Sequence, residues 1–144
     1  MIVSQILKSK QEVGVISVKP TDSISEAAQL LSKHRIGTVV VSADGESLDG
    51  ILSERDIVRE LGNRGAGCLS DQVKALMTAN ITTCKPSDTA LQVLEVMTEG
   101  RFRHVPVMED GKMIGLVSIG DAVKARLAQL AMEKESLEGM IMGH

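Results

Sequence analysis

The residue pattern best suited to chemistry occurs twice in this chain, as Gly, two hydrophobic residues, Ser, two further residues and Asp. It reads GILSERD over 50–56 and GLVSIGD over 115–121. An apolar run that ends in Ser before a helix leaves backbone amides and a hydroxyl at the positive end of the helix dipole, which favours anions. The aspartate one turn later can accept hydrogen bonds from a vicinal diol such as ribose, and hydrogen bonds to charged groups contribute about 1.5–3 kcal/mol each. Ser53 with Asp56, and Ser118 with Asp121, are therefore candidate nucleotide anchors.

The same spacing has a purely structural interpretation, because Ser-x-x-Asp is also an ordinary helix cap. Its recurrence does not separate the two interpretations, since a fold that is repeated also repeats its caps. A third hypothesis is an enzyme, for instance a nucleotide hydrolase that uses Asp56 or Asp121. The sequence has no HExxH, GxSxG, Walker or GxGxxG motif, and its three histidines lack metal-ligand spacing. We therefore expect no catalytic residue, no metal site and no catalytic cofactor.

The two patterns lie in two copies of one supersecondary unit, residues 15–58 and 81–123, which share twelve identical residues. Apolar runs and turn residues predict a strand, a helix, a hairpin and a helix in each copy. The expected order in the first copy is strand 15–18, a helix after Ser23, strands 38–42 and 48–52, and a helix from 53. In the second copy it is strand 81–84, helix 88–99, strands 104–108 and 112–118, and a helix from 119.

The predicted fold class is therefore α+β, with tandem βαββα repeats and extra helices at both ends. We expect the first repeat with the N-terminal helix over 1–62, a flexible connection and short helix over 63–77, and the second repeat with the C-terminal helix over 78–144. A copy of about 60 residues is marginally stable by itself, so the copies should fold as one module. In the C-terminal helix, an apolar stripe either packs on the module's own core or forms a surface for self-association; it consists of Val123, Leu127, Leu130, Leu137 and Ile141, with Lys134 at the remaining position.

Composition excludes several classes of partner. The net charge is −3 and Phe102 is the single aromatic residue. Both features disfavour nucleic acid as a partner, because proteins that bind nucleic acid rely on basic patches and on aromatic side chains that stack with bases. There is no apolar run long enough for a membrane span or a signal peptide, so we expect a cytoplasmic protein with no membrane partner. The two cysteines lack paired spacing; Cys84 is predicted to be buried and Cys68, in a glycine-rich segment, to be an exposed thiol.

KPTD at 19–22, KPSD at 85–88, VPV at 105–107 and the two Ser-x-x-Asp motifs together resemble a tandem pair of CBS domains, a Bateman module. The resemblance covers about residues 10–125 and is closest to small stand-alone CBS proteins of bacterial type. It implies a pseudo-two-fold pair of repeats with two clefts for adenine nucleotides. In each cleft, the serine hydroxyl would bind phosphate and the aspartate would bind ribose.

The resemblance also implies the remaining site residues. Backbone atoms before the first strand of each repeat would recognise adenine, and residues before the Pro-Val strand would contact phosphate. Because aromatic residues are lacking, the adenine slot would be aliphatic, and the cations of the second repeat make the Ser118 cleft the expected stronger site. The Ser118/Asp121 cleft would use Val13, Gly14, Val15 and Arg103; the Ser53/Asp56 cleft would use Asn80, Ile81, Gly37 and Thr38, with His104 turned toward it. Pro106 would line the aliphatic adenine slot.

The function implied by the resemblance is a sensor of adenine nucleotides that acts through conformational or oligomeric change. AMP is the expected ligand, with ADP, ATP, NAD(H) and S-adenosylmethionine as further candidates. The expected partners are a second copy of the chain, as a homodimer, and an unidentified effector protein. The alternative is a structural or protein-interaction module whose clefts are vestigial.

Overall fold

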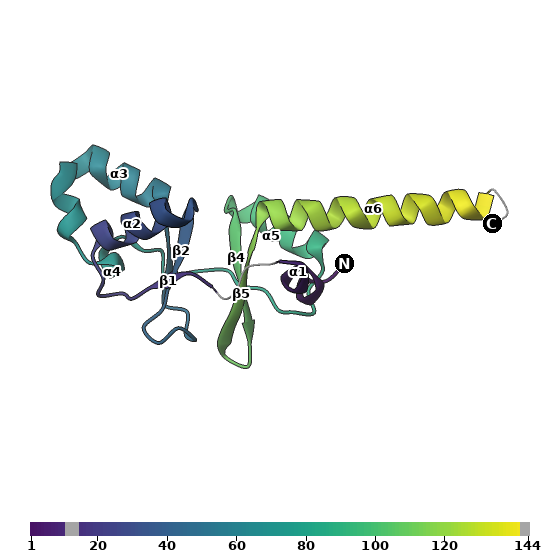
Figure 1. Ribbon diagram of the computed structural model, residues 1–144, viewed down its shortest axis with the longest axis horizontal. Coiled ribbons are helices and arrows are strands. Elements are labelled where there is room, and N and C mark those ends of the chain that lie inside the picture. The colour runs from purple at the N-terminus through teal and green to yellow at the C-terminus, as the bar shows by residue number, and fades with distance from the viewer. Residues whose placement is uncertain (11–14, 142–144) are drawn as a thin grey trace. The chain divides into compact units, whose positions relative to one another are not determined.

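The chain is divided between two compact units, and a computed structural model describes its residues 1–10 and 15–141. The first unit consists of residues 15–81 and 110–114, and contains the first repeat. The second unit consists of residues 1–10, 82–109 and 115–141, and contains the second repeat. Figure 1 labels the helices and strands of both units. None of the helices within these residues combines the length and apolarity needed to cross a membrane.

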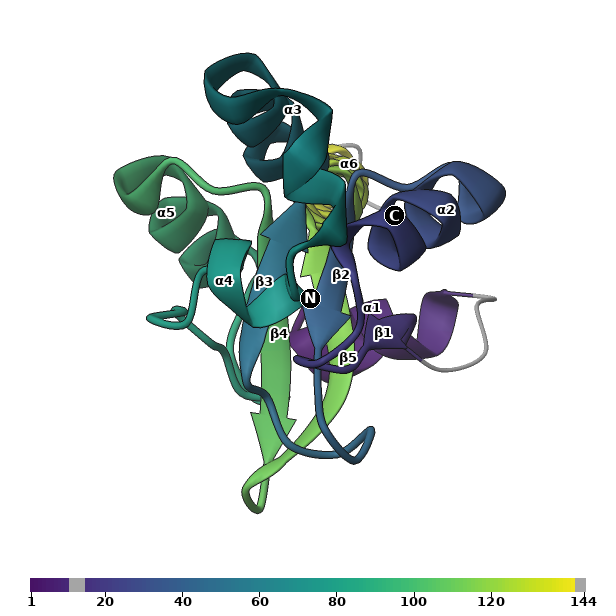
Figure 2. The same ribbon diagram turned by 90° about the vertical axis from the view of Figure 1, so that its left-hand side faces the viewer.

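The first unit is built on a three-stranded sheet in the order β1-β2-β3, which lies at the centre of Figure 2. Strand β1 (Ser17–Val18) runs parallel to β2 (Thr38–Val41), and β2 runs antiparallel to β3 (Gly50–Ser53), with Thr38 opposite Ser53. All four residues of β2 are buried, since helices α2 (Ile24–His34) and α3 (Glu54–Arg64) add Ile24, Leu31 and Ile57 to the same core. The register places Ser53 at the end of β3, directly before α3.

The second repeat follows this plan with a two-stranded sheet, β4 (His104–Glu109) and β5 (Lys112–Ser118), although residues 112–114 of β5 group with the first unit. Helices α5 (Ala90–Gly100) and α6 (Ile119–Ile141) add Val93, Met97 and Ala122 to its core. The predicted strand 81–84 is reduced to a single parallel bridge between Cys84 and Val107. The predicted α+β class and the tandem repeats are confirmed.

Short helices that precede each repeat pack on the other repeat. Helix α1 (Val3–Ser9) belongs to the second unit, and α4 (Val73–Leu76) belongs to the first. The two make matching backbone hydrogen bonds: Val3 N donates to the Asp88 carbonyl at 2.8 Å, and Val73 N donates to the Asp22 carbonyl at 2.8 Å. The N-terminal helix, which the sequence predicts to belong with residues 1–62, thus adds its apolar side chains to the core of the second repeat.

The glycine-rich segment after the first repeat is more ordered than the sequence predicts. Helix α3 continues through Gly62 to Arg64, and a 3₁₀ helix, η1 (Gly65–Ser70), follows at once. Cys68 in η1 is fully buried, so its predicted exposure is wrong. Gly65 adopts φ +76°, a left-handed conformation that glycine adopts without strain, and this lets the chain turn directly from α3 into η1.

Candidate functional site

Ser118 and Asp121 form a reciprocal hydrogen-bonded pair where β5 ends and α6 begins. The amide of Ser118 donates to Asp121 Oδ2 at 2.9 Å, and the amide of Asp121 donates to Ser118 Oγ at 3.1 Å. Two backbone amides at the start of the helix are thereby satisfied, as in a capping box. The pair predicted from the sequence is therefore in contact, and it already works as a helix cap.

Lys10 adds a cation to this pair. Its Nζ donates to Asp121 Oδ2 at 2.9 Å and to the carbonyl of Leu116 at 2.8 Å, and both side chains of the ion pair are mostly covered, at 23% and 24% exposure. Burial by itself opposes ionisation of Asp121, but the hydrogen bonds from Lys10 and Ser118 hold its pKa below the usual value. An ammonium has three N–H donors and two are used here, so the third can reach an anion.

Sequence reasoning missed Lys10. The residue lies before the first repeat and is 111 positions from Asp121, so neither motif spacing nor helical periodicity connects the two. The equivalence of the segments that precede the two repeats is visible only in the structure, in the matching backbone hydrogen bonds of Val3 and Val73.

Arg103 and His104 lie beside the same helix start. The amide of Ile119, the first residue of α6, donates to the carbonyl of Arg103 at 2.8 Å, and His104 is the first residue of β4. The Arg103 side chain is exposed and forms no ion pair among the described residues, so it is available to an anion.

His104 differs from the expectation that it is a cationic donor. Burial, followed by the positive charge of Lys10, lowers its pKa from the ordinary value of 6.5, although Asp121 acts in the opposite sense. The imidazole is therefore neutral at pH 7 and can donate one hydrogen bond without a full charge. The cationic role at this site passes to Lys10 and Arg103.

Ser53 and Asp56 form the equivalent pair at the start of α3. The amide of Ser53 donates to Asp56 Oδ2 at 2.9 Å, the hydroxyl of Ser53 donates to the same oxygen at 3.0 Å, and the amide of Asp56 donates to Ser53 Oγ at 3.2 Å. The other carboxylate oxygen, Oδ1, accepts from Arg59 at 3.0 Å. Both oxygens of Asp56 are thus engaged, whereas among the described residues no donor reaches Oδ1 of Asp121.

Gly37 and Thr38 occupy the positions that Arg103 and His104 occupy in the second repeat. The amide of Glu54, the first residue of α3, donates to the carbonyl of Gly37 at 2.8 Å, which matches the bond from Ile119 to Arg103. A Cβ added to Gly37 would lie 3.4 Å from the carboxylate of Glu54. The first repeat therefore has a carboxylate where the second has an exposed arginine, and this difference makes the first site less favourable for phosphate.

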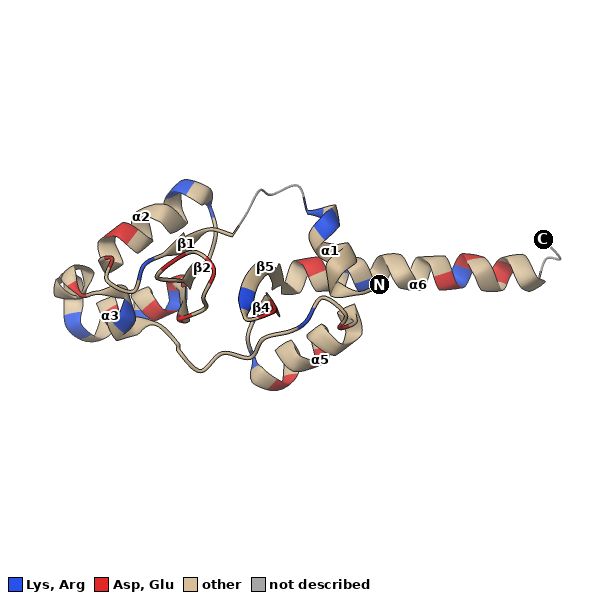
Figure 3. Cartoon of the chain, turned by 90° about the horizontal axis from the view of Figure 1, so that it is seen from below, with Lys and Arg blue, Asp and Glu red and all other residues tan. Residues whose placement is uncertain are grey.

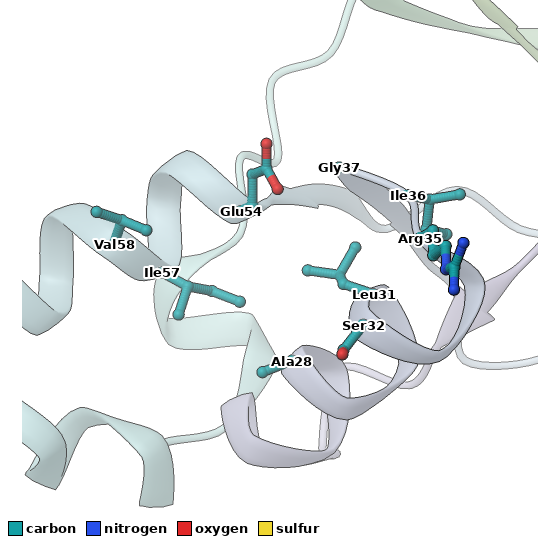
Figure 4. Close-up of a pocket in the computed structure, with 9 residues that line it drawn as sticks. All are labelled: Ala28, Leu31, Ser32, Arg35, Ile36, Gly37, Glu54, Ile57 and Val58. Carbon is teal, nitrogen blue, oxygen red and sulfur yellow. The ribbon is translucent and has the colours of Figure 1, made fainter.

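A pocket of about 480 Å³ lies in the first unit next to Gly37 and Glu54, and Figure 4 shows its lining. Helices α2 and α3 supply Leu31, Ile57 and Val58 to its walls, and Arg35 and Glu54 are its charged groups. The pocket is mainly apolar and suits an aliphatic or ring-shaped group better than a phosphate.

The first residue of each motif must be glycine because the segment that precedes the other repeat, α1 or the end of α4, packs closely against it. A Cβ at Gly50 would lie 2.7 Å from the sulfur of Met77 and 3.0 Å from the carbonyl oxygen of Thr78, and one at Gly115 would lie 2.6 Å from a methyl carbon of Leu7. Each glycine thus admits the segment that precedes the other repeat. In the second unit, this packing brings the end of α1, and therefore Lys10, to the Ser118 motif.

For the other residues predicted to contact adenine, the structure gives the burial and the backbone contacts within each unit. Val13 and Gly14 lie outside the described residues, and Val15 is half-buried just before β1. Asn80 is exposed and Ile81 half-buried, after an antiparallel bridge between Ile51 and Thr78. Pro106 is buried in β4, where its carbonyl accepts from the Cys84 amide at 2.9 Å. Their roles in ligand binding stay predictions.

Comparison with known proteins identifies relatives of the whole chain. The family model for the CBS domain matches residues 4–63 and again residues 73–128. A curated relative, the mitochondrial CBS domain-containing protein CBSX3 of Arabidopsis thaliana, is 34% identical over 98% of this chain and 72% of its own length.

Solved structures agree with this match. The CBS-domain containing protein ATU1752 from Agrobacterium tumefaciens has a TM-score of 0.81 and 45% identity, over 87% of this chain and 92% of its own. The CBS domain protein PAE2072 from Pyrobaculum aerophilum, solved as a complex with AMP, has a TM-score of 0.73 and 26% identity, over 84% and 89% of the two chains. The CBS domain pair of protein MJ0100, solved with 5′-methylthioadenosine and S-adenosyl-L-methionine, has a TM-score of 0.74 and 25% identity, over 86% and 98%. With two family matches and full-length relatives, this chain belongs to the CBS domain family and carries a CBS pair.

Proposed function

We propose that this chain is a regulatory module that binds an adenosine-containing ligand, with AMP as the leading candidate and the Ser118/Asp121 motif as its phosphate and ribose anchor. The proposal extends to a cytoplasmic protein without catalytic activity, which passes the ligand signal to a partner through a change of conformation or assembly. ADP, ATP, NAD(H) and S-adenosylmethionine are the other ligands to be compared.

The observation that carries this proposal is the group of donors around the start of α6. Lys10 Nζ lies 2.9 Å from Asp121 Oδ2, with one N–H donor left, and the exposed Arg103 guanidinium belongs to the residue whose carbonyl accepts the first amide of the same helix. Charge-assisted hydrogen bonds from lysine and arginine are among the strongest available to a phosphate. The ligands in the PAE2072 and MJ0100 structures support an adenosine compound as the class.

A second function, a structural or interaction module with vestigial clefts, is favoured by one specific observation. Both Ser-x-x-Asp pairs form complete reciprocal caps with no ligand involved. If the motifs are kept for helix stability alone, their replacement lowers the free energy of unfolding and changes no affinity. The two functions therefore predict different outcomes for one variant.

Asp121→Asn is the variant that separates them. Asparagine retains an oxygen that accepts the amide of Ser118, so the cap survives, whereas the negative charge that pairs with Lys10 is lost. Isothermal titration with AMP, and then with the other four ligands, should show sub-millimolar binding to the natural sequence and at least about tenfold weaker binding to the variant. Asp56→Asn is the matched control at the site with Glu54, and it should change the affinity less.

Two results would count against the proposal. Failure of every adenosine compound to bind at sub-millimolar concentration would favour the structural module. Equal affinities of Asp121→Asn and the natural sequence for AMP would leave binding in place but remove this motif as the anchor.

A further inference from the structure

Helix α6 presents an apolar stripe that its own unit leaves largely exposed. Among the residues of α6, Ala122 and Ala125 in the first turns are the buried ones, and Figure 1 shows α6 continuing beyond α1 and α5. The stripe residues are well exposed, with Val123 at 41%, Leu127 at 62%, Leu130 at 43%, Leu137 at 58% and Ile141 at 76%. The alternative that this stripe packs on the module's own core is therefore not realised.

The spacing of the stripe is that of a two-helix seam. Its members follow alternating steps of four and three residues, with Lys134 at the one polar position. This is the a/d pattern of a coiled coil, in which the residues that flank the seam select partner and orientation by charge. In α6 one flank carries Arg126 and Glu133, and the other carries Lys124 and Glu138. Figure 3 shows that basic and acidic residues occur along this helix.

A second α6 that runs in the opposite direction places opposite charges together on both flanks of the seam. When Leu127 of one helix packs against the partner's Leu130, Arg126 faces the partner's Glu133 and Lys124 faces the partner's Glu138. Because the arrangement is symmetric, each ion pair forms twice. Lys134 then lies opposite the partner's Val123, where its aliphatic stem can cover the valine while its ammonium reaches water.

Other alignments of the same two helices place like charges together. In a parallel pair, Lys134 faces the partner's Lys134 and Glu133 lies beside the partner's Glu138. If the antiparallel pair is shifted by one heptad in either direction, Arg126 faces the partner's Arg126 or Glu133 faces the partner's Glu133. Like charges at flanking positions oppose association, so a single alignment is favoured.

We propose that α6 binds α6 of a second copy of this chain as an antiparallel pair, with Leu127 and Leu130 at its centre and the Arg126–Glu133 and Lys124–Glu138 pairs fixing the alignment. This contact makes the protein a homodimer through its C-terminal helix. The contact does not depend on nucleotide binding, so its test is independent of the proposed function.

The first test is sedimentation equilibrium of the full chain without nucleotide. The natural sequence should be a dimer, and Leu130→Glu should be a monomer at the same concentration. Leu91→Glu is the matched control, because Leu91 on α5 is also 43% exposed and lies outside the stripe. A monomeric natural protein, or a dimer that survives Leu130→Glu, would overturn the proposal.

A charge exchange tests the alignment. Arg126→Glu should raise the dimer dissociation constant about tenfold, because it places two carboxylates together at both ends of the seam. Adding Glu133→Arg should restore the natural value. In a parallel pair these residues do not face each other, so failure of the double variant to restore association would contradict the antiparallel arrangement.

A distance measurement tests the direction. A spin label on Met140→Cys, close to the end of α6, should be separated from its copy by about 35 Å along the helix axis, from 1.5 Å of rise over the residues between them. In a parallel pair the two labels lie side by side. A single short distance in the pulsed dipolar spectrum would therefore contradict the proposal.

Discussion

Lys10 and Asp121, 111 positions apart in the chain, form an ion pair at 2.9 Å where α6 begins. The pair exists because α1, which precedes the first repeat, packs in the second unit against Gly115. A cation is thereby delivered to one Ser-x-x-Asp motif from outside its own repeat. Asp56, in the other motif, pairs with Arg59 of its own helix at 3.0 Å, and that arginine is 65% exposed.

Replacing Lys10 with Met should weaken the binding of AMP more than it weakens the fold. The lost hydrogen bond to phosphate is worth about 1.5 kcal/mol, which corresponds to about a tenfold loss of affinity. The ion pair itself contributes about 1 kcal/mol or less to stability, since it is partly exposed. Titration calorimetry and thermal unfolding measure the two effects. Lys8→Met, on the exposed side of the same segment, is the control, and a gain in affinity for Lys10→Met would show instead that Lys10 obstructs the site.

Val3→Ala should destabilise the second repeat, although Val3 precedes the first repeat in the chain. The side chain is fully buried in the second unit, and loss of two methyl groups with the resulting cavity costs about 2 kcal/mol. Amide hydrogen exchange should show faster opening of α5 and β4 while β2 stays protected.

Val73→Ala provides the reciprocal test. Val73 is also fully buried and lies in the first unit, so its loss should open β2 and spare β4. If each variant instead speeds hydrogen exchange in the repeat that follows it in sequence, the packing of α1 on the second repeat and of α4 on the first is contradicted.

Acidification below neutral pH should destabilise the protein partly through His104. Its pKa in the folded protein lies below the usual 6.5, so the unfolded state binds the proton more strongly and the free energy of unfolding falls as the pH drops through 6.5. The pKa of Asp121 is also lowered, but its contribution is lost only as the pH falls below about 4.

Urea unfolding at pH 7.5 and pH 5.5 measures this effect, and His104→Gln should reduce the difference between the two values. His34→Gln, at an exposed position, is the control and should leave the difference unchanged. An unchanged pH dependence in His104→Gln would contradict the assignment.

Both cysteines should react slowly with thiol reagents in the folded protein. Burial, with a smaller contribution from Asp88, raises the pKa of Cys84 to about 12, and Cys68 is fully enclosed in η1. A thiolate is the reactive species, so little of Cys84 is reactive at pH 8, and burial blocks the access of reagent to Cys68. Labelling with a chromogenic disulfide should be complete only after denaturant is added, and rapid labelling of one thiol in buffer would show that η1 opens.

The sequence by itself determined the repeats, the βαββα order and both Ser-x-x-Asp pairs, because capping and strand periodicity are local properties of the chain. Gly50 and Gly115 could likewise be identified from the sequence, because each opens the local Gly-x-x-Ser-x-x-Asp pattern. The family was expected from the resemblance of these motifs to a CBS pair, and the family matches confirm it.

Only the tertiary structure decided what surrounds those motifs. Lys10 reaches Asp121, Cys68 is buried and His104 is neutral because segments far apart in the chain pack together, and packing of this kind has no period in the sequence. The exposed stripe of α6 is the converse case. Its heptad spacing was readable, but only the fold shows that its own core leaves the stripe uncovered, because the first turns of α6 use a different face, through Ala122 and Ala125, to reach that core.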